Sequence, residues 1–217
     1  MINWQDIDTV ILDMDGTVLD LHFDNRFWMQ HLPAAYARHH QLSPQAGLDE
    51  LLGRFARFEG SLQWYCVDFW SEQVGFDVAE LKQDLKHLIR ERADAFSFLA
   101  QLQRSGRHVI LATNAHRASL ELKLAETTLG QYFQAVVSSH DYGYAKEDQR
   151  FWQALQQAHP FDPERSLFID DSETVLRSAQ TFGIRHLLTI SQPDSERPAR
   201  QGLHFPAFND FAELGAP

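Results

Sequence analysis

Cysteine is almost absent from this chain, since Cys66 is the single one among 217 residues. One cysteine excludes an internal disulfide and any metal site built on several cysteines. It also fits the reducing cytoplasm. Long apolar runs are missing too: the longest spans four residues, as from Trp64 to Val67, so we expect no membrane-spanning helix and no membrane partner. The opening MINWQDIDTV lacks the basic start and apolar stretch of a secretory signal, and we expect a cytoplasmic protein.

Basic residues are in short supply. Lys and Arg total 19 against 30 Asp and Glu, which gives a formal net charge of −11. Because binding to nucleic-acid polymers depends on Lys and Arg against phosphate, we expect no partner of that class. The hydrophobic content of 44% is nevertheless enough for a packed core, which excludes wholesale disorder.

Charge and aromatic residues are divided unevenly along the chain. Residues 22–92 hold 10 acids and 8 bases, so this interval is close to neutral. They also hold 11 of the 26 aromatic side chains in about a third of the sequence. This difference in composition indicates two distinct bodies in one polypeptide.

Outside that interval, short apolar runs alternate with amphipathic segments. The runs predict buried strands at Thr9–Leu12, His108–Ala112, Ala135–Ser138, Ser166–Ile169 and His186–Ile190. The amphipathic segments predict helices at Ala93–Arg104, Arg117–Leu129, Asp148–Ala158 and Glu173–Phe182, and Gly106, Gly130 and Gly183 follow three of them as expected helix ends. This alternation predicts an α/β fold with a Rossmann-like, doubly wound parallel sheet. The tail from Ser191 is expected to be largely irregular and docked by Phe205, Phe208 and Phe211.

The interval between the first two strands is far too long for one crossover helix. We therefore predict that residues 22–92 form an inserted helical cap domain, while 1–21 and 93–217 form the catalytic core. The expected cap helices are Asn25–Arg38, Pro44–Glu59, Leu62–Gln73 and Val78–Leu88.

Chemically active side chains follow four of the predicted strands. They are Asp13–Thr17 after the first, Thr113 and Asn114 after the second, Lys146 beyond the third, and Asp170 and Asp171 after the fourth. Ligands of an open parallel sheet bind beyond these strand ends. Clustered carboxylates need a cation, and oxygen donors alone suit Mg²⁺. Adding a lysine and a hydroxyl describes a site that stabilises a phosphoryl group in transfer.

In order and spacing, these residues resemble the four motifs of the haloacid dehalogenase-like hydrolase superfamily, over 8–21 and roughly 93–190. The resemblance implies that Asp13 is the nucleophile of an aspartyl-phosphate intermediate. It implies that Asp15 protonates the leaving alcohol and then activates water. Thr113, Asn114 and Lys146 would hold the phosphoryl group. Mg²⁺ would bind to Asp13, the backbone carbonyl of Asp15 and Asp170, with Asp171 as an indirect or water-mediated partner.

Asp15 also separates branches of this superfamily. Dehalogenase members lack an acid two residues after the nucleophile, because no oxygen leaving group needs a proton. The presence of Asp15 therefore indicates a phosphohydrolase or a phosphomutase.

A closer resemblance, to the bacterial GMP/IMP nucleotidase subgroup, extends over nearly the whole chain. It is carried by Phe23–Asn25, Phe27, Trp28, Trp64–Cys66, Asp68, Trp70–Gln73, Tyr144–Arg150 and Phe168–Glu173. The resemblance implies 5′-nucleotidase activity on purine monophosphates, a small-molecule phosphate ester.

Five cap residues are candidate substrate contacts. Trp28 and Tyr65 are expected to stack on a nucleobase, although helix packing explains most cap aromatics equally well. Asp68, or Asp24, would accept a hydrogen bond from the base edge. Arg54 would close on the anion, against the alternative of a merely solvated face.

Three alternatives stay open. A sugar-phosphate or phosphoglycolate phosphatase, or a phosphomutase, would use the same core residues, because the cap selects the substrate. A non-catalytic binding protein on the same fold is disfavoured, since such a protein needs no acid at position 15.

A zinc site is not expected from the sequence. The 11 histidines follow no zinc-binding spacing, and Cys66 is interpreted as a packing residue.

Overall fold

The structure is a computed structural model that describes residues 2–217. Its centre is a parallel sheet with the strand order β3-β2-β1-β4-β5-β6. The strands are β1 (Thr9–Leu12), β2 (His108–Thr113), β3 (Ala135–Ser138), β4 (Ser166–Ile169), β5 (His186–Ile190) and β6 (Ala207–Phe208). The predicted α/β fold with a doubly wound parallel sheet is confirmed, and all five predicted strands are present.

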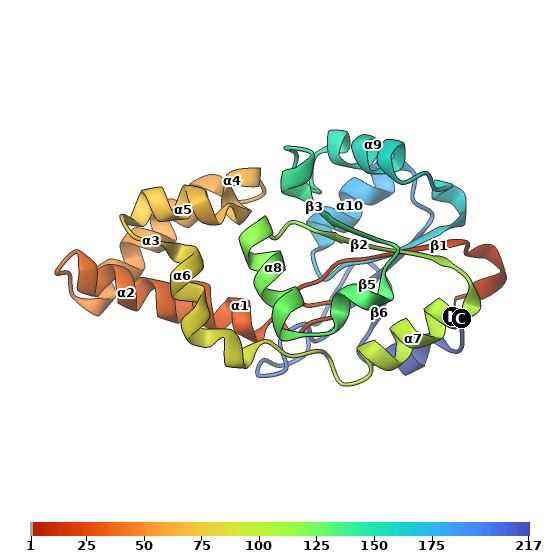
Figure 1. Ribbon diagram of the computed structural model, residues 1–217, viewed down its shortest axis with the longest axis horizontal. Coiled ribbons are helices and arrows are strands. Elements are labelled where there is room, and N and C mark those ends of the chain that lie inside the picture. The colour runs from red at the N-terminus through yellow and green to blue at the C-terminus, as the bar shows by residue number, and fades with distance from the viewer. Residues whose placement is uncertain (1) are drawn as a thin grey trace.

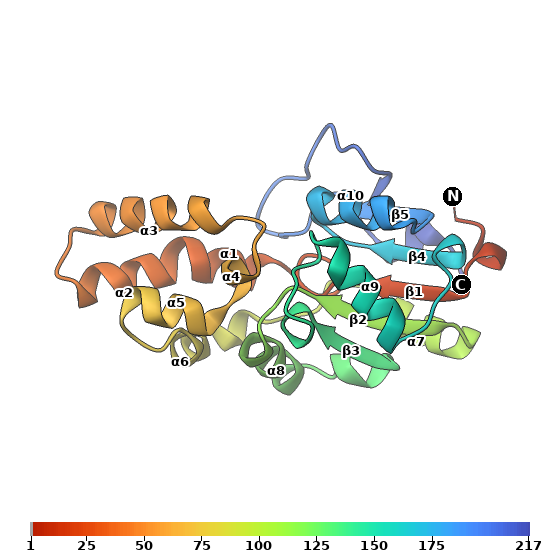
Figure 2. The same cartoon turned by 90° about the horizontal axis from the view of Figure 1, so that it is seen from above.

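Helices cover both faces of this sheet (Figures 1 and 2). They are α7 (Ala95–Ser105) and α8 (Arg117–Glu126) on one face, and α9 (Gln149–Ala158) and α10 (Glu173–Phe182) on the other. Strand residues alternate between two buried clusters: Val10 packs with Phe98 of α7, and Ile11 packs with Trp152 of α9. Burial on both faces explains why the strands read as continuous apolar runs.

Two of the three glycines expected at helix ends are confirmed. Gly106 and Gly183 follow α7 and α10 with φ of +75° and +111°, a conformation that glycine adopts without strain. The prediction for Gly130 is wrong. Helix α8 ends earlier, because Thr127 is extended and its hydroxyl donates a hydrogen bond to the Lys123 carbonyl, and Gly130 lies in the 3-10 turn Leu129–Tyr132.

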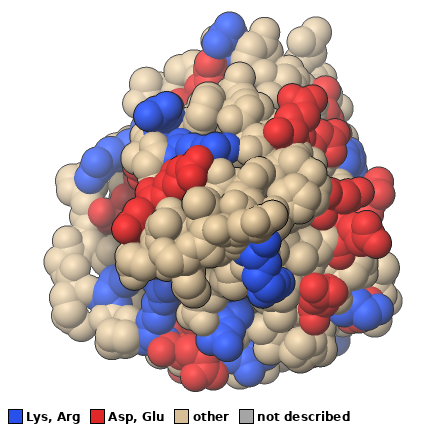
Figure 3. All heavy atoms as spheres, turned by 90° about the vertical axis from the view of Figure 1, so that its left-hand side faces the viewer, with Lys and Arg blue, Asp and Glu red and all other residues tan. Residues whose placement is uncertain are grey.

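The segment between β1 and β2 is helical and extends from the sheet at the end opposite the two termini (Figure 1). It contains α1 (His22–Arg26), a π-helical segment (Phe27–His31), α2 (Leu32–His39), α3 (Pro44–Phe58), α4 (Leu62–Tyr65), α5 (Val67–Val74), α6 (Val78–Lys82) and the 3-10 segment Gln83–Leu88. These helices share a separate apolar cluster in which Phe55 meets Trp70 edge-on, with ring centroids 4.8 Å apart. Figure 3 views this end, where acidic and basic side chains are interspersed.

One predicted helix in this segment is divided. The range Leu62–Gln73 breaks at Cys66, whose backbone is extended and whose Sγ accepts a hydrogen bond from the Phe69 amide at 3.4 Å. Cys66 therefore caps α5 instead of continuing α4. The range Val78–Leu88 likewise tightens from α6 into a 3-10 segment at Gln83.

The C-terminal tail is largely irregular, as predicted, apart from β6 and the 3-10 turn Phe211–Leu214. Phe205, Phe208 and Phe211 are buried, as expected, but Phe208 belongs to β6, which pairs with Ile190 of β5. A two-residue strand carries no alternation that a sequence pattern can reveal. Within residues 2–217, no helix is both long and apolar enough to cross a bilayer.

Candidate active site

The residues after β1, β2 and β4 meet at one edge of the sheet. Leu12 is in register with Leu111 and with Ile169, so β1 and β4 end at the same level and β2 continues two residues further, to Thr113. The Asp13 amide donates a hydrogen bond to the Ile169 carbonyl at 3.0 Å, which fixes Asp13 beside Asp170. The sheet register therefore brings together motifs that lie far apart in the sequence.

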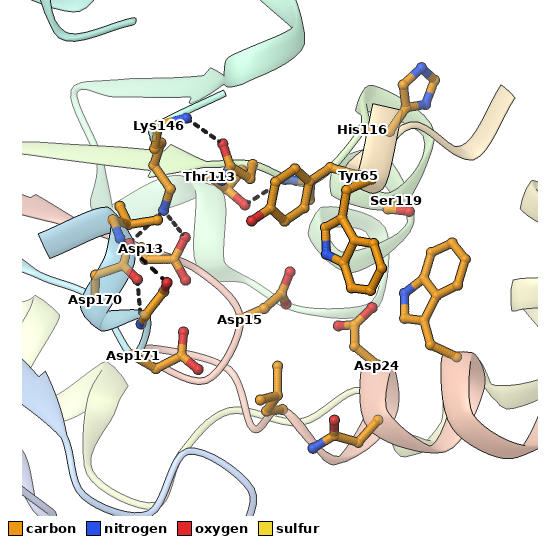
Figure 4. Close-up of a pocket in the computed structure, with 18 of the residues that line it drawn as sticks. Asp13, Asp15, Asp24, Tyr65, Thr113, His116, Ser119, Lys146, Asp170 and Asp171 are labelled. Atoms are coloured by element: carbon orange, nitrogen blue, oxygen red, sulfur yellow. Dashed lines mark hydrogen bonds and ion pairs between the residues drawn. The ribbon is translucent and has the colours of Figure 1, made fainter. Parts of the chain in front are cut away.

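Lys146 lies at the centre of this edge and is 2% exposed (Figure 4). Its ammonium donates to Oδ1 of Asp13 at 2.5 Å, to Oδ2 of Asp170 at 2.7 Å and to the Ala112 carbonyl at 3.0 Å. Its backbone amide donates to Oδ1 of Asn114 at 2.9 Å. Burial lowers the pKa of Lys146, but the two carboxylates outweigh burial and raise it above its ordinary value. Lys146 is therefore a fixed cation.

Three carboxylates crowd around that cation. One oxygen each of Asp13, Asp170 and Asp171 lies within 4.8 Å of the others. Burial raises the pKa of Asp13 to about 7, and the nearby Asp170 adds to this while Lys146 opposes it. Burial together with Asp170 and Asp13 raises the pKa of Asp171 well above its usual range. Crowded carboxylates that all supply oxygen suit a hard divalent cation, which would relieve their repulsion.

Asp15 lies apart from this carboxylate cluster, on the side nearer Asp24 (Figure 4). Its Oδ1 is 2.6 Å from the ammonium of Lys123, which is also 2.6 Å from Oδ2 of Asp24. Burial raises the pKa of Asp15 to about 7; Asp24 and Asp13 add to the rise, and Lys123 opposes it. A carboxyl group that titrates near neutrality can both donate and accept a proton, as general acid–base catalysis requires.

Asp24 links the pair of Asp15 and Lys123 to a second buried lysine. Lys82, 2% exposed, has its ammonium 3.1 Å from Oδ1 of Asp24 and faces the rings of Phe27 and Trp28. Burial raises the pKa of Asp24, but Lys123 and Lys82 outweigh it and lower that pKa to about 2. The sequence analysis missed both lysines. The available signal was their place three or four residues after a buried apolar residue, on the inward face of a helix.

A cavity of about 240 Å³ opens between the sheet edge and the helices inserted after β1. Its lining contains every predicted core residue: Asp13, Asp15, Thr113, Asn114, Lys146, Asp170 and Asp171. Its other wall is largely aromatic and includes Trp28, Phe55, Trp64, Tyr65 and Trp70, with Asp24, Lys82 and His116 also lining the cavity. The cavity therefore has one end formed by the motif residues and another that is largely aromatic, beside the buried pair of Lys82 and Asp24.

Some of the cap candidates line this cavity, as Asp24 does, and others lie outside it. Trp28 and Tyr65 line it, and the Tyr65 hydroxyl donates to Oε1 of Glu147 at 2.6 Å, which links the inserted segment to the core. Arg54 is outside, because its guanidinium is engaged by Glu50 at 2.6 Å within its own helix. Asp68 is also outside; its side chain is 77% exposed.

A parallel sheet that gathers two aspartates, a threonine, a buried lysine and a second aspartate pair at one edge defines a class of aspartate-based hydrolases. The sequence profile described as a haloacid dehalogenase-like hydrolase matches residues 7–183. The chain therefore belongs to the haloacid dehalogenase-like hydrolase family, and we conclude that it is a phosphoric monoester hydrolase.

Individual relatives agree with the family assignment. The chain is 42% identical over 213 residues to the GMP/IMP nucleotidase YrfG of Escherichia coli strain K12, covering 98% of this chain and 96% of the relative. It is 25% identical to the (S)-2-haloacid dehalogenase H-109 of Pseudomonas putida, covering 82% and 84%. The structure of a HAD phosphatase from Thermococcus onnurineus superposes with a TM-score of 0.81 at 20% identity, covering 97% and 99%.

Proposed function

We propose that this protein is an Mg²⁺-dependent 5′-nucleotidase that hydrolyses purine nucleoside monophosphates such as GMP and IMP to nucleoside and phosphate. The observation that carries this proposal is a cavity whose charged end is formed by the motif residues and whose other end is aromatic. The 42% identity to the E. coli GMP/IMP nucleotidase over 98% of the chain supports the same substrate class.

The shape of the cavity supports one orientation of the substrate. The phosphate would lie at the end formed by Thr113, Asn114 and Lys146, where a fixed ammonium offsets its charge. The base would lie toward Trp28 and Tyr65, whose rings offer faces for stacking.

In this proposal, recognition of the substrate and catalysis belong to different parts of the chain. Residues 22–92 would form the cap that selects the base, and 1–21 with 93–217 would form the catalytic core. The separate aromatic cluster of the inserted helices supports this division.

The donor set of the carboxylate cluster fits Mg²⁺. Asp13, the backbone carbonyl of Asp15 and Asp170 would hold the ion, and an Asp171 oxygen belongs to the same cluster. When bound, the ion would neutralise charge on the phosphoryl oxygens. This position of Asp171 supports a contact with the ion, either direct or through a water molecule.

The chemistry would proceed in two steps on the chain's own residues. A carboxylate oxygen of Asp13 attacks phosphorus, the bond from phosphorus to the 5′-oxygen breaks, and Asp15 donates its proton to that oxygen as the nucleoside leaves. Asp15, now a carboxylate, removes a proton from water, which attacks the phosphorus of the aspartyl phosphate and releases inorganic phosphate. Lys123 would hold Asp15 in place through both steps.

A phosphate-release screen tests this function. Purified protein is supplied with Mg²⁺ and with GMP, IMP, AMP, CMP, UMP, hexose phosphates or phosphoglycolate, and the Asp13→Asn variant is the control. We expect the highest kcat/KM on GMP and IMP, loss of turnover in Asp13→Asn and loss after chelation by EDTA. Preference for a sugar phosphate or phosphoglycolate would replace the nucleotide assignment with another phosphatase of the same core. Conversion without phosphate release would indicate a phosphomutase, and inactivity on all of them would contradict the proposal.

A further inference from the structure

A sulfur and two imidazoles converge at a second place, at the edge of the cavity. One donor atom each of Cys66, His116 and His140 lies within 4.8 Å of the other two. Cys66 separates α4 from α5, His116 precedes α8, and His140 lies in the 3-10 turn Ser139–Asp141 after β3. The two imidazole rings meet edge-on with centroids 4.8 Å apart. Segments far apart in the sequence therefore supply these three groups.

Among the described residues, one donor atom of this group is unpaired, whereas Cys66 Sγ already accepts a hydrogen bond from the Phe69 amide and His116 has contacts of its own. Nε2 of His140 is buried and has no hydrogen-bond partner within residues 2–217. Nδ1 of His116 accepts a long hydrogen bond of 3.4 Å from the Ala118 amide, which places the proton of the neutral ring on Nε2, 3.6 Å from Oδ2 of Asp68. An ion bound at Nε2 would therefore shift that proton to Nδ1 and replace the contact with Ala118. Cys66 Sγ lies at the N-terminus of α5, where the helix dipole favours a negative group. An unpaired buried nitrogen costs free energy, which a bound ion would recover.

The protonation state of His140 is also suitable for a metal ligand. Burial lowers the pKa of His140 to about 4, and the neighbouring His116 adds to this effect. The ring is therefore neutral at pH 7, and metal ions bind neutral imidazole.

We propose that Cys66, His116 and His140 form a site for Zn²⁺, separate from the carboxylate cluster of Asp13, Asp170 and Asp171. Thiolate and imidazole donors favour zinc, whereas oxygen donors alone favour Mg²⁺. Tetrahedral zinc holds such donors at about 2.0–2.3 Å and therefore about 3.3–3.8 Å from one another, so the group would contract by up to about 1.5 Å on binding. Asp68 or a water molecule would complete four-coordination.

This site would link the inserted helices to the core. Cys66 belongs to the helical segment, whereas His116 and His140 are positioned by β2 and β3, and His116 also lines the cavity. Zinc bound here would hold the cavity closed and slow the exchange of substrate and product. The zinc site does not depend on the proposed phosphatase function; only the slower exchange of substrate and product rests on it.

Cobalt(II), a spectroscopic probe for zinc, tests the site without any assay of activity. Titration of the protein with Co²⁺ in excess Mg²⁺ should produce a thiolate-to-cobalt charge-transfer band that added Zn²⁺ abolishes. Cys66→Ser retains an N-cap hydroxyl for α5 and should lose the band. His140→Ala should bind Co²⁺ at least about 10-fold more weakly, in the range seen when zinc sites lose supporting groups. His87→Ala, which removes an exposed histidine of the same helical segment, should behave as wild type.

Two results would overturn the zinc site. One is a wild-type cobalt spectrum without a thiolate band. The other is a Zn²⁺-induced rise in Tm that is equal in wild type, His140→Ala and, if it folds, Cys66→Ser.

Inhibition of the phosphatase activity by Zn²⁺ is measured separately, at saturating Mg²⁺. Zn²⁺ should inhibit wild type at least about 10-fold more potently than Cys66→Ser. Equal potency would place inhibition at the carboxylate cluster and contradict the closure. Absence of phosphatase activity would refute the proposed function and leave the cobalt result to decide the site.

Discussion

The ammonium of Lys123 lies 2.6 Å from Oδ1 of Asp15, the carboxyl group assigned to proton transfer. Lys123 is almost fully buried, so water screens this contact little. The same ammonium holds Asp24 at 2.6 Å, which ties the position of Asp15 to the first inserted helix. The charge on Lys123 therefore controls both the position and the acidity of Asp15.

Replacing Lys123 by methionine should make Asp15 a weaker acid. Lys123 lowers the pKa of Asp15 against the effect of burial, so its loss raises that pKa. The limb of the pH–rate profile that belongs to Asp15 should move upward by about 1–3 pH units. Steady-state kcat/KM from pH 5 to 9 measures this shift, with Lys123→Arg as the charge-retaining control. An unchanged profile in a folded Lys123→Met protein would show that Lys123 does not act on Asp15.

Asp24 should stabilise the fold in a pH-dependent way. Its folded pKa of about 2 lies below the ordinary aspartate value of 3.8, so its contribution is present above pH 4 and is lost as the pH falls toward 2. Asp24→Asn leaves Lys82 and Lys123 partly unpaired and should lower the free energy of unfolding by about 3–5 kcal/mol at pH 7.

Urea denaturation at pH 7, 5, 4 and 3 measures this difference between wild type and Asp24→Asn. The difference should shrink below pH 4. Asp49→Asn, at an exposed position on α3, is the control and should change stability little. A difference that is the same at every pH would rule out the assigned role of the Asp24 charge.

Gly16 should tolerate no side chain. Its φ is +78°, and a Cβ there would lie 2.8 Å from Cγ and Oδ2 of Asp171. Gly16→Ala should lower stability by about 1–2 kcal/mol from the backbone conformation alone. It should also displace Asp171 and raise the Mg²⁺ concentration needed for half-maximal activity. Gly53→Ala on α3 meets nothing within 4 Å and is the matched control. Equal Mg²⁺ dependence in Gly16→Ala and wild type would remove Asp171 from the ion's surroundings.

Tyr65 should contribute to substrate retention through its hydroxyl. The hydrogen bond to Glu147 joins the inserted helices to the core at the cavity wall. Tyr65→Phe should raise KM by about 2- to 10-fold, the equivalent of one hydrogen bond of about 0.5–1.5 kcal/mol. Tyr36→Phe removes a hydroxyl that donates to Glu50, away from the cavity, and should leave KM unchanged. A wild-type KM in Tyr65→Phe would count against this role.

The sequence predicted the sheet well because its central strands β1, β2 and β4 are buried on both faces. Thr9–Leu12 and Ser166–Ile169 are apolar enough to be recognised, and the parallel register then brings Asp13 and Asp170 together. The inserted helices were less predictable. The break at Cys66 depends on a sulfur that caps α5, which no periodicity reveals.

The two buried lysines that pair with Asp24 show a different limit of prediction from sequence. Lys82 and Lys123 look like solvated helix residues, and only the fold buries them against Asp24. The group of Cys66, His116 and His140 was missed for the same reason, since its members lie on separate elements and share no spacing. The chain's excess of acidic residues does not give the cavity an equal excess of negative charge. Buried lysines neutralise several of the acids that line it.

The central claim is that Asp13 is the nucleophile, and chemical trapping of its phosphate ester tests it most directly. Protein in turnover with GMP and Mg²⁺ is quenched and treated with borohydride, which reduces an aspartyl phosphate to homoserine. Peptide mass spectrometry should then find homoserine at position 13 in the wild type. In Asp13→Asn it should be absent, together with phosphate release. Turnover with no modification at position 13, or with an Asp13→Asn variant that still releases phosphate, would contradict the account.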